Sequence, residues 1–261
     1  MLKFCANLSW LFPDLDFLDR IDAAKKAGFA GIEVLFPYEE DAIGIADRLR
    51  AQRLEMALIN CPPPAYNGAI PGFAALPGGE ARFRQDFKRS LRYVARFRAQ
   101  HLHLMAGSAE GPEARETFVR NLKWAAAEAP EQSLTIEPIN CHDMPGYFLC
   151  DFDQAAEILD EVAAPNVNLQ FDAYHAQRIH GDALAVWAKH GHRAVHVQVA
   201  QVPLRSEPDA GQEGEAGGID YRAFFQSLED SGYKGWVSGE YRPRANTSAG
   251  LDWISPAFRA S

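Results

Sequence analysis

Eight short apolar runs with the alternation of β-strands recur along the chain, and segments with helical spacing lie between most of them. The runs are 3–8, 31–36, 54–60, 101–107, 134–138, 167–172, 194–200 and 236–241. Strands that alternate with helices predict a parallel sheet, and eight is the number of units that closes a (β/α) barrel. We therefore expect an α/β fold, with one TIM-barrel domain over residues 1–261.

The helical segments support this interpretation. Phe83, Phe87, Leu91 and Val94 recur every three or four residues, which is the spacing of a buried helix face. A doubly wound open sheet is the structural alternative, but no G-x-G-x-x-G follows an early strand. Two Pro- and Gly-rich loops, 61–79 and 203–218, are too long to be simple connections. Both follow strands, so in a barrel they lie on the face that carries active sites.

Four consecutive strands are predicted to turn a polar side chain into the barrel near their carboxyl ends. Side chains alternate between the two faces of a strand, and the apolar set packs against the helices. This alternation turns inward Glu137, Asp172, Gln198 and Glu240. The other residues predicted to face inward on these strands are Thr135, Asn168, Gln170, His196 and Ser238.

Three acids that converge in a partly dry interior repel one another unless a cation or bound protons compensate. A divalent metal ion is the economical solution. The two glutamates, the aspartate and the glutamine carbonyl offer only oxygen donors, a set that favours Mg²⁺ or Mn²⁺ over Zn²⁺ or copper. No local ligand motif supports the site, so it depends on the barrel, and a polar network without metal is the alternative.

The net charge and the cysteine content limit the partners and the cellular compartment that we expect for this protein. The formal net charge is −9, which disfavours a surface for nucleic acid or anionic lipid and favours a small-molecule partner. The four cysteines form no C-x-x-C pair, so we expect reduced thiols in a cytoplasmic protein. We expect no signal peptide and no membrane span, because no stretch reaches ~18 uninterrupted apolar residues. The oligomeric state is open, with a homo-oligomer among the alternatives.

Several motifs resemble those of the hydroxypyruvate isomerase family, within the xylose-isomerase-like TIM barrels. They are FCANLSWLFPDLDFLDR, AGFAGIEVLFPY, IEPIN, QFDAYHAQRIHGD, VHVQVA, SLEDSGYKGWVSGEYRPR and AGLDWI. The similarity runs from about residue 3 to residue 255. HLHLMAG and FDAYHAQ look equally like a sister branch, the 2-oxo-tetronate isomerases, whereas IEPIN looks like the hydroxypyruvate branch.

The resemblance implies roles for particular residues. Glu137, Asp172, Gln198 and Glu240 look like the family's metal ligands, and Glu137 and Glu240 also look like its acid and base. His175 and Arg205 are similar to residues that contact substrate. One departure concerns the loop after Arg205: EPDAGQEGEAGGIDY is longer than the family's usual G-x-G-E-I-[DN]-Y, and Gly218 replaces the glutamate.

Two further residues are predicted to line the pocket from their position on strands. His103 and Glu33 face inward on their strands, where filling of the barrel or anchoring of a loop are the alternatives.

The implied reaction interconverts hydroxypyruvate and tartronate semialdehyde by metal-assisted proton transfer through an enediolate, without nicotinamide or flavin. A 2-oxo-tetronate isomerase is the alternative, followed by a ketose 3-epimerase, which usually has histidine where this chain has Gln198. Hydride shift needs more acids than the sequence offers. Cleavage of damaged DNA needs a His-rich zinc cluster and a basic face. A barrel that only binds a sugar acid conflicts with the intact Glu137 and Glu240.

Overall fold

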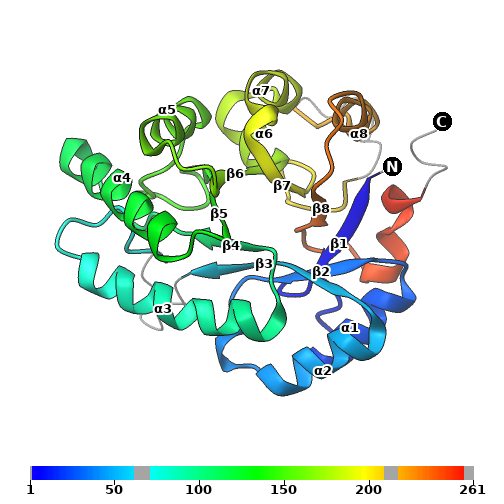
Figure 1. The fold of residues 1–261 in the computed structure, drawn as a ribbon. Coiled ribbons are helices and arrows are strands. Elements are labelled where there is room, and N and C mark those ends of the chain that lie inside the picture. The colour runs from blue at the N-terminus through cyan, green and yellow to red at the C-terminus, as the bar shows by residue number, and fades with distance from the viewer. Residues whose placement is uncertain (1, 62–70, 209–216, 256–261) are drawn as a thin grey trace.

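A closed barrel of eight parallel strands forms the centre of the protein in the residues that the structure describes. The structure is a computed structural model that describes residues 2–61, 71–208 and 217–255. The strands follow one another around the barrel from β1 to β8, and β8 pairs with β1 to close it. Helices surround the strands on the outside (Figure 1). The predicted TIM barrel is confirmed.

All eight predicted strands are present. They are β1 (Lys3–Asn7), β2 (Gly31–Val34), β3 (Glu55–Cys61), β4 (His101–Leu104), β5 (Ser133–Ile136), β6 (Val167–Asp172), β7 (Ala194–Val199) and β8 (Trp236–Gly239). The α-helices are α1 (Phe17–Lys26), α2 (Ala42–Gln52), α3 (Glu80–Phe97), α4 (Gly111–Glu128), α5 (Phe152–Val162), α6 (Ala173–His180), α7 (Ala183–His190) and α8 (Tyr221–Asp230). Short 3₁₀ turns are η1 (Pro37–Glu39), η2 (Gly191–Arg193), η3 (Thr247–Gly250) and η4 (Asp252–Ile254).

Strand ends differ from the prediction by a few residues, in ways that concern the site. β5 ends at Ile136, one residue before Glu137, because Pro138 has no N–H to continue the ladder. β8 ends at Gly239, one residue before Glu240. β3 includes Cys61, which was expected to open a loop. Residues 62–70 and 209–216 of the two predicted long loops lie outside the described part of the chain.

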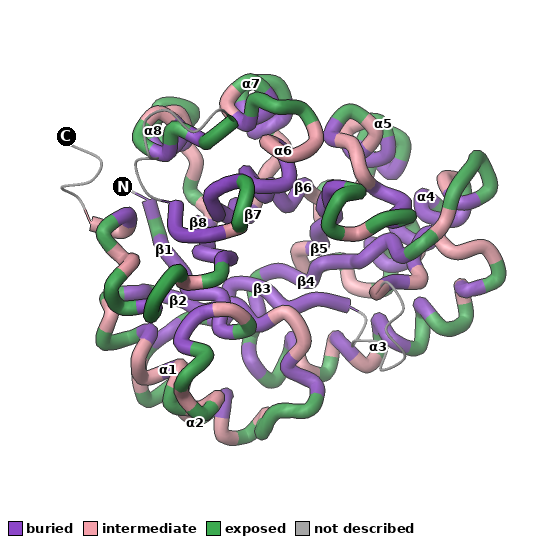
Figure 2. The backbone as a smooth tube through the Cα atoms, turned by 180° about the vertical axis from the view of Figure 1, so that it is seen from behind, coloured by how far each residue is buried: buried purple, intermediate pink, exposed green. Residues whose placement is uncertain are grey.

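The core lies between the strands and the inner faces of the helices. Phe83, Phe87 and Val94 of α3 are buried, as their spacing predicts. Figure 2 shows burial along the strands and exposure along the outer sides of the helices. Inside the barrel, a small apolar cluster of Cys5, Ala57 and Trp236 lies near the amino ends of the strands. The carboxyl ends are left for polar side chains.

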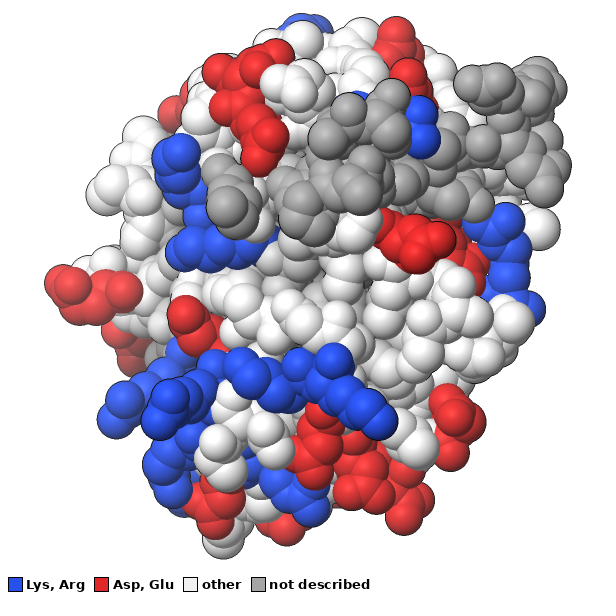
Figure 3. Space-filling view, turned by 90° about the vertical axis from the view of Figure 1, so that its right-hand side faces the viewer, with Lys and Arg blue, Asp and Glu red and all other residues white. Residues whose placement is uncertain are grey.

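The outer surface mixes charges of both signs. Figure 3 shows Lys and Arg in a band across the lower part of one side, with Asp and Glu directly beside it. On this side the basic side chains are therefore bordered by acidic ones. Among the described helices, none combines the length and the apolar character that a membrane crossing requires.

Candidate active site

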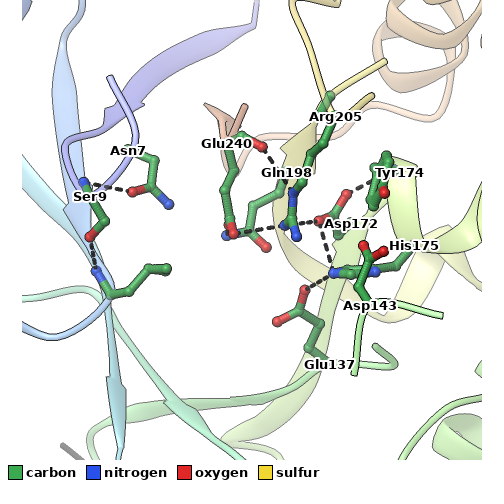
Figure 4. A network of polar contacts seen from close by, with 12 residues as sticks. Asn7, Ser9, Glu137, Asp143, Asp172, Tyr174, His175, Gln198, Arg205 and Glu240 are labelled. Atoms are coloured by element: carbon green, nitrogen blue, oxygen red, sulfur yellow. Dashed lines mark hydrogen bonds and ion pairs between the residues drawn. The ribbon is translucent and has the colours of Figure 1, made fainter. Parts of the chain in front are cut away.

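The four inward-facing polar residues predicted from the strand pattern meet at the carboxyl ends of the strands. The side chains of Glu137, Asp172, Gln198 and Glu240 converge in one network (Figure 4). All four are buried, with at most 6% of any residue exposed. Asp172 and Gln198 are register partners on β6 and β7, which places their side chains at the same depth. The structure therefore brings the predicted group together.

Arg205 joins two of the acids. One of its terminal nitrogens lies 2.8 Å from Glu240 Oε1 and 3.1 Å from Asp172 Oδ2. The guanidinium lies over the rings of Trp10, at 5.2 Å, and Tyr174, at 5.0 Å. Aromatic faces on which a cation packs restrict its position and add an electrostatic attraction. Arg205 is thus held at the centre of the acids.

The backbone around Arg205 is fixed by a short turn after β7. Gln201 and Ser206 exchange backbone hydrogen bonds of 2.8 and 3.2 Å. Arg242 donates its backbone N–H to the Arg205 carbonyl at 2.8 Å, which ties this turn to the segment after β8. The part of the longer loop that departs from the family pattern begins beyond this turn. Among the described residues, these backbone bonds fix the position of Arg205.

Burial and mutual repulsion favour the protonated forms of the three acids. Burial, with the charges of Glu240 and Asp172, raises the pKa of Glu137 well above its ordinary value. Burial raises the pKa of Glu240 to about 8, although Arg205 opposes this. The pKa of Asp172 is also raised by burial, against the effect of Arg205. The single positive charge of Arg205 thus offsets the negative charge of the three carboxylates only in part. A further cation or bound protons would stabilise the group.

His175 faces Glu137 and Asp172 with one nitrogen and Asn140 with the other. His175 Nδ1 accepts from the Asn140 backbone N–H at 3.3 Å and lies 2.7 Å from Asn140 Nδ2. Burial, with the nearby Arg205 charge, lowers the pKa of His175 well below its ordinary value, so the ring is neutral. A backbone N–H only donates, so the proton of the neutral ring is on Nε2. Nε2 lies 3.5 Å from Asp172 Oδ2 and 3.8 Å from Glu137 Oε1.

The donor set suits a hard divalent cation. Ligand atoms of Glu137, Asp172 and His175 lie within 4.8 Å of one another, and all three residues are buried. The carboxylates supply the oxygen donors and the negative charge that Mg²⁺ and Mn²⁺ prefer. His175 Nε2 carries a proton in the tautomer that Asn140 selects, so His175 is better suited to donate to a bound oxygen than to ligate a metal.

The glutamines of β6 and β7 connect the acids to one another. Gln170 Nε2 lies 2.9 Å from Glu137 Oε2 and 2.7 Å from Gln198 Oε1. Gln198 directs its amide nitrogen to Glu33 Oε1, at 2.9 Å, and to Glu240. The carbonyl of Gln198 is therefore turned to Gln170, and ligation of a metal through this carbonyl requires rotation of the amide. Amide orientation follows from the hydrogen-bond partners.

The structure places Glu33 and His103 deeper than the mouth of the barrel. Glu33 is fully buried and bonds His196 Nε2 at 2.6 Å and Asn7 Nδ2 at 2.7 Å. Burial alone would raise the pKa of Glu33, but the charge and hydrogen bond of His196 bring it below its ordinary value. His103 is also fully buried and lies with Nδ1 3.5 Å from Glu137 Oε2. Glu33 thus supports Gln198 from below, and His103 lies beside Glu137.

Replacing Glu33 by alanine is expected to destabilise the fold by about 3–5 kcal/mol, because His196 then loses its partner in a fully buried position. Urea unfolding measures the effect. Asp47→Ala is the matched control, since Asp47 pairs with Arg50 at 2.9 Å on the exposed surface, where such a pair contributes roughly 0–1 kcal/mol. Equal losses in the two variants would show that the buried pair does not stabilise the fold.

The metal-free protein is expected to become less stable as the pH rises from about 7 to 8, above the range in which His103 and His175, with their lowered pKa values, act in the opposite direction. Glu240 has a folded pKa of about 8, against roughly 4.3 in an unfolded chain. Between these values the folded state binds the proton and the unfolded state does not, so the stabilisation present at low pH is lost as the pH passes 8. The slope is up to about 1.4 kcal/mol per pH unit for each such group.

Thermal unfolding in a chelator at several pH values tests this expectation. Because a metal binds ionised carboxylates, Mn²⁺ is expected to raise the unfolding temperature more at pH 8 than at pH 5. A metal-free unfolding temperature that is flat or rises between about pH 7 and 8 would contradict the raised pKa values.

Sequence reasoning gave no role to four residues that shape the site: Trp10, Asn140, Gln170 and Tyr174. Gln170 was predicted to face inward, and its place two residues before Asp172 on the same strand is the signal for its role. Asn140 and Trp10 lie in loops, where no periodicity indicates direction. Their contacts with His175 and Arg205 become visible only in three dimensions.

Comparison with known proteins finds relatives over nearly the whole chain. The family model described as xylose isomerase-like TIM barrel matches residues 21–257. A 2-oxo-tetronate isomerase from Cupriavidus necator is 42% identical, with 98% of each chain covered. A hydroxypyruvate isomerase from Escherichia coli is 36% identical, over 98% of this chain and 99% of the relative. A crystal structure from Brucella melitensis, named as an AP endonuclease of family 2, superposes with a TM-score of 0.91 at 40% identity, over 98% of this chain and 99% of that one.

Proposed function

The chain belongs to the xylose isomerase-like TIM-barrel family, and its named relatives show it to be an isomerase of the ketose–aldose class; from this premise we propose that it interconverts hydroxypyruvate and tartronate semialdehyde. The observation that carries the proposal is the convergence of two buried glutamates, Glu137 and Glu240, beside Asp172 and Arg205 (Figure 4). Each has a raised pKa. A pair of this kind supplies one acid and one base.

The chemistry requires removal of a weakly acidic proton. Hydroxypyruvate has a ketone at C2, between a carboxylate and a CH₂OH group at C3. Moving a hydrogen from C3 to C2 passes through an enediolate, in which negative charge develops on oxygen. The catalyst must therefore remove one proton, return another to the neighbouring carbon and stabilise that charge.

Glu137 and Glu240 are proposed to carry the two proton transfers. Because each carboxylate disfavours ionisation of the other, the singly ionised pair is favoured over the doubly ionised pair. In that state one glutamate accepts the proton from carbon and the other donates one. Gln170 holds Glu137 through Oε2, and Gln198 holds Glu240 through the same oxygen of its carboxylate. These contacts leave the second oxygen of Glu137 for proton exchange.

His175, as a hydrogen-bond donor, and Arg205, as a cation, are proposed to bind the substrate oxygens. His175 Nε2–H faces the space between Glu137 and Asp172 and suits a substrate hydroxyl or carbonyl oxygen. Burial alone would lower the pKa of Arg205, but the three carboxylates raise it, so the guanidinium stays charged. It is suited to hold a carboxylate or an enediolate oxygen.

A bound Mg²⁺ or Mn²⁺ would be held by Glu137, Asp172 and Glu240, with Gln198 as a fourth ligand if its amide rotates. It would supply Lewis-acid stabilisation of the developing oxyanion. The partly uncompensated carboxylates and their all-oxygen donor set support this assignment.

A second substrate is supported by one specific observation. The relative at 42% identity is a 2-oxo-tetronate isomerase, against 36% for the Escherichia coli hydroxypyruvate isomerase. 2-Oxo-tetronate has the same ketone beside a carboxylate and a hydroxyl on C3, and one carbon more. The same residues would catalyse the same hydrogen transfer on it.

A substrate panel tests the proposal. Purified protein is assayed with hydroxypyruvate, 2-oxo-tetronate and free ketoses, with Mn²⁺, with Mg²⁺ and with chelator. DNA with an abasic site is included because of the name of the Brucella melitensis structure. Turnover of a hydroxy-keto acid supports the proposal, whereas strand cleavage or turnover confined to ketoses would refute it.

The same reaction in D₂O is expected to introduce deuterium at carbon. Proton transfer through a carboxylate allows exchange with solvent, and a hydride shift between C3 and C2 does not. Mass spectrometry of the product measures the label. Full turnover without deuterium in the product would rule out Glu137 and Glu240 as proton carriers.

A further inference from the structure

The loop between β5 and α5 is folded back on itself beside the candidate active site. Ile139 donates its backbone N–H to the Leu149 carbonyl at 2.9 Å, and Phe148 donates to the Gly107 carbonyl at 2.9 Å. At the start of the loop, Asn140 Oδ1 accepts from the backbone N–H groups of His142 and Asp143 at 3.1 and 3.0 Å. The Ile139–Leu149 bond brings the two ends of the loop together.

Two cysteines lie just beyond this bond, one on each side. Cys141 is exposed and Cys150 is partly exposed. The Ile139–Leu149 bond holds their chain segments side by side, near enough for the thiols to interact: burial, together with an interaction with Cys141, raises the pKa of Cys150 to about 11. Cys150 also lines a surface cavity of about 500 Å³, which opens between the β4–α4 and β5–α5 loops. Small solutes can therefore approach Cys150 through this cavity, and Cys141 from the open surface.

The other two cysteines are protected. Cys5 and Cys61 are fully buried. Burial raises the pKa of Cys61 to about 12, and that of Cys5 is also raised. Dissolved oxidants do not reach thiols that are fully buried, so these two cysteines are inert.

We propose that Cys141 and Cys150 form an oxidation site that a hydroperoxide converts to an intramolecular disulfide. The Cys141 thiol reacts first, because it is the more exposed, and gives a sulfenic acid while the hydroperoxide ROOH leaves as ROH. The Cys150 thiol then attacks the Cys141 sulfur, and one water is released. In total, two thiols and ROOH give one disulfide, ROH and water. A dithiol reductant reverses the reaction.

The disulfide would act on the active site through Asn140. Asn140 is fully buried, precedes Cys141 and holds His175 Nδ1. Bonding draws the two sulfur atoms to about 2.05 Å, and the backbone next to Asn140 must adjust. The oxidised protein is therefore expected to have a kcat several-fold below that of the reduced protein.

Peptide mapping of the full-length protein tests the site. The reduced protein is treated with one to a few equivalents of hydrogen peroxide, alkylated and cut on the amino side of aspartates, which separates Cys141 from Cys150 at Asp143. We expect a disulfide-linked pair of peptides that dithiothreitol separates, with Cys5 and Cys61 alkylated only after unfolding. Free Cys141 and Cys150 after treatment, or bridges between two protein molecules, would overturn the proposal.

Two single variants test the order of events. In Cys150→Ser, Cys141 is expected to stop at the sulfenic acid, which dimedone traps. In Cys141→Ser, Cys150 is expected to remain a free thiol at the same peroxide dose. Oxidation of Cys150 in the absence of Cys141, at the rate seen in the wild type, would refute Cys141 as the first site of attack.

The kinetic readout is the only part that rests on the proposed function, and turnover by the reduced protein establishes that function before oxidant is added. The loss of kcat is expected to be absent in Cys141→Ser/Cys150→Ser treated in the same way. A fully disulfide-bonded protein with unchanged kcat would refute the link through Asn140.

Discussion

Replacing Glu240 by glutamine is expected to lower turnover by about 10³-fold, within the range that a positioned acid or base contributes. Glutamine keeps the size of the side chain and one oxygen for the Gln198 contact, but it neither accepts nor donates a proton at carbon. It also removes a carboxylate from Arg205, whose nitrogen lies 2.8 Å from Glu240 Oε1. The fold should persist, because the variant removes a buried charge with a raised pKa.

Steady-state kinetics and circular dichroism separate the chemical from the structural effect. Glu55→Gln is the matched control, since Glu55 begins β3 at the opposite end of the barrel and is exposed. Because Glu137 and Glu240 are proposed to act as a unit, the double variant with both glutamines should be little worse than either single variant. Turnover close to the wild type in Glu240→Gln would refute the assignment.

Removing divalent metal is expected to lower turnover by about three orders of magnitude, since Lewis-acid stabilisation contributes several kcal/mol at the transition state. The measurement is the rate after dialysis against a chelator and after readdition of Mn²⁺ or Mg²⁺. Asp172→Asn should weaken the binding of Mn²⁺, followed by its electron paramagnetic resonance signal. Full activity in chelator, or unaltered Mn²⁺ binding in Asp172→Asn, would contradict the proposed metal site.

The spacing of apolar residues along the sequence was sufficient to predict the fold and the main group of acids. Alternation along four strands predicted which side chains enter the barrel, and the network of Glu137, Asp172, Gln198 and Glu240 follows that prediction. The alternation of side chains between the two faces of a strand is a property of the backbone. It can therefore be predicted from a single sequence without knowledge of the neighbouring strands.

Other features depend on partners far along the chain and could not be predicted in this way. The amide of Gln198 is oriented by Gln170, Glu33 and Glu240, which lie on three other strands or at their ends. The tautomer of His175 depends on Asn140, and the position of Arg205 depends on Trp10 and Tyr174. Loop residues have no fixed alternation, so sequence alone gives no direction for their side chains.

The pairing of β8 with β1 determines when, during synthesis, the candidate active site is complete. Gln198 joins Glu33, from the second strand to leave the ribosome, to Glu240, which follows the last. During synthesis, β1 has an unpaired edge and the set of acids is incomplete until β8 and Glu240 have been made. The newborn chain thus acquires the proposed proton-transfer pair in a single late event, and the appearance of activity would time the closure of the barrel during translation.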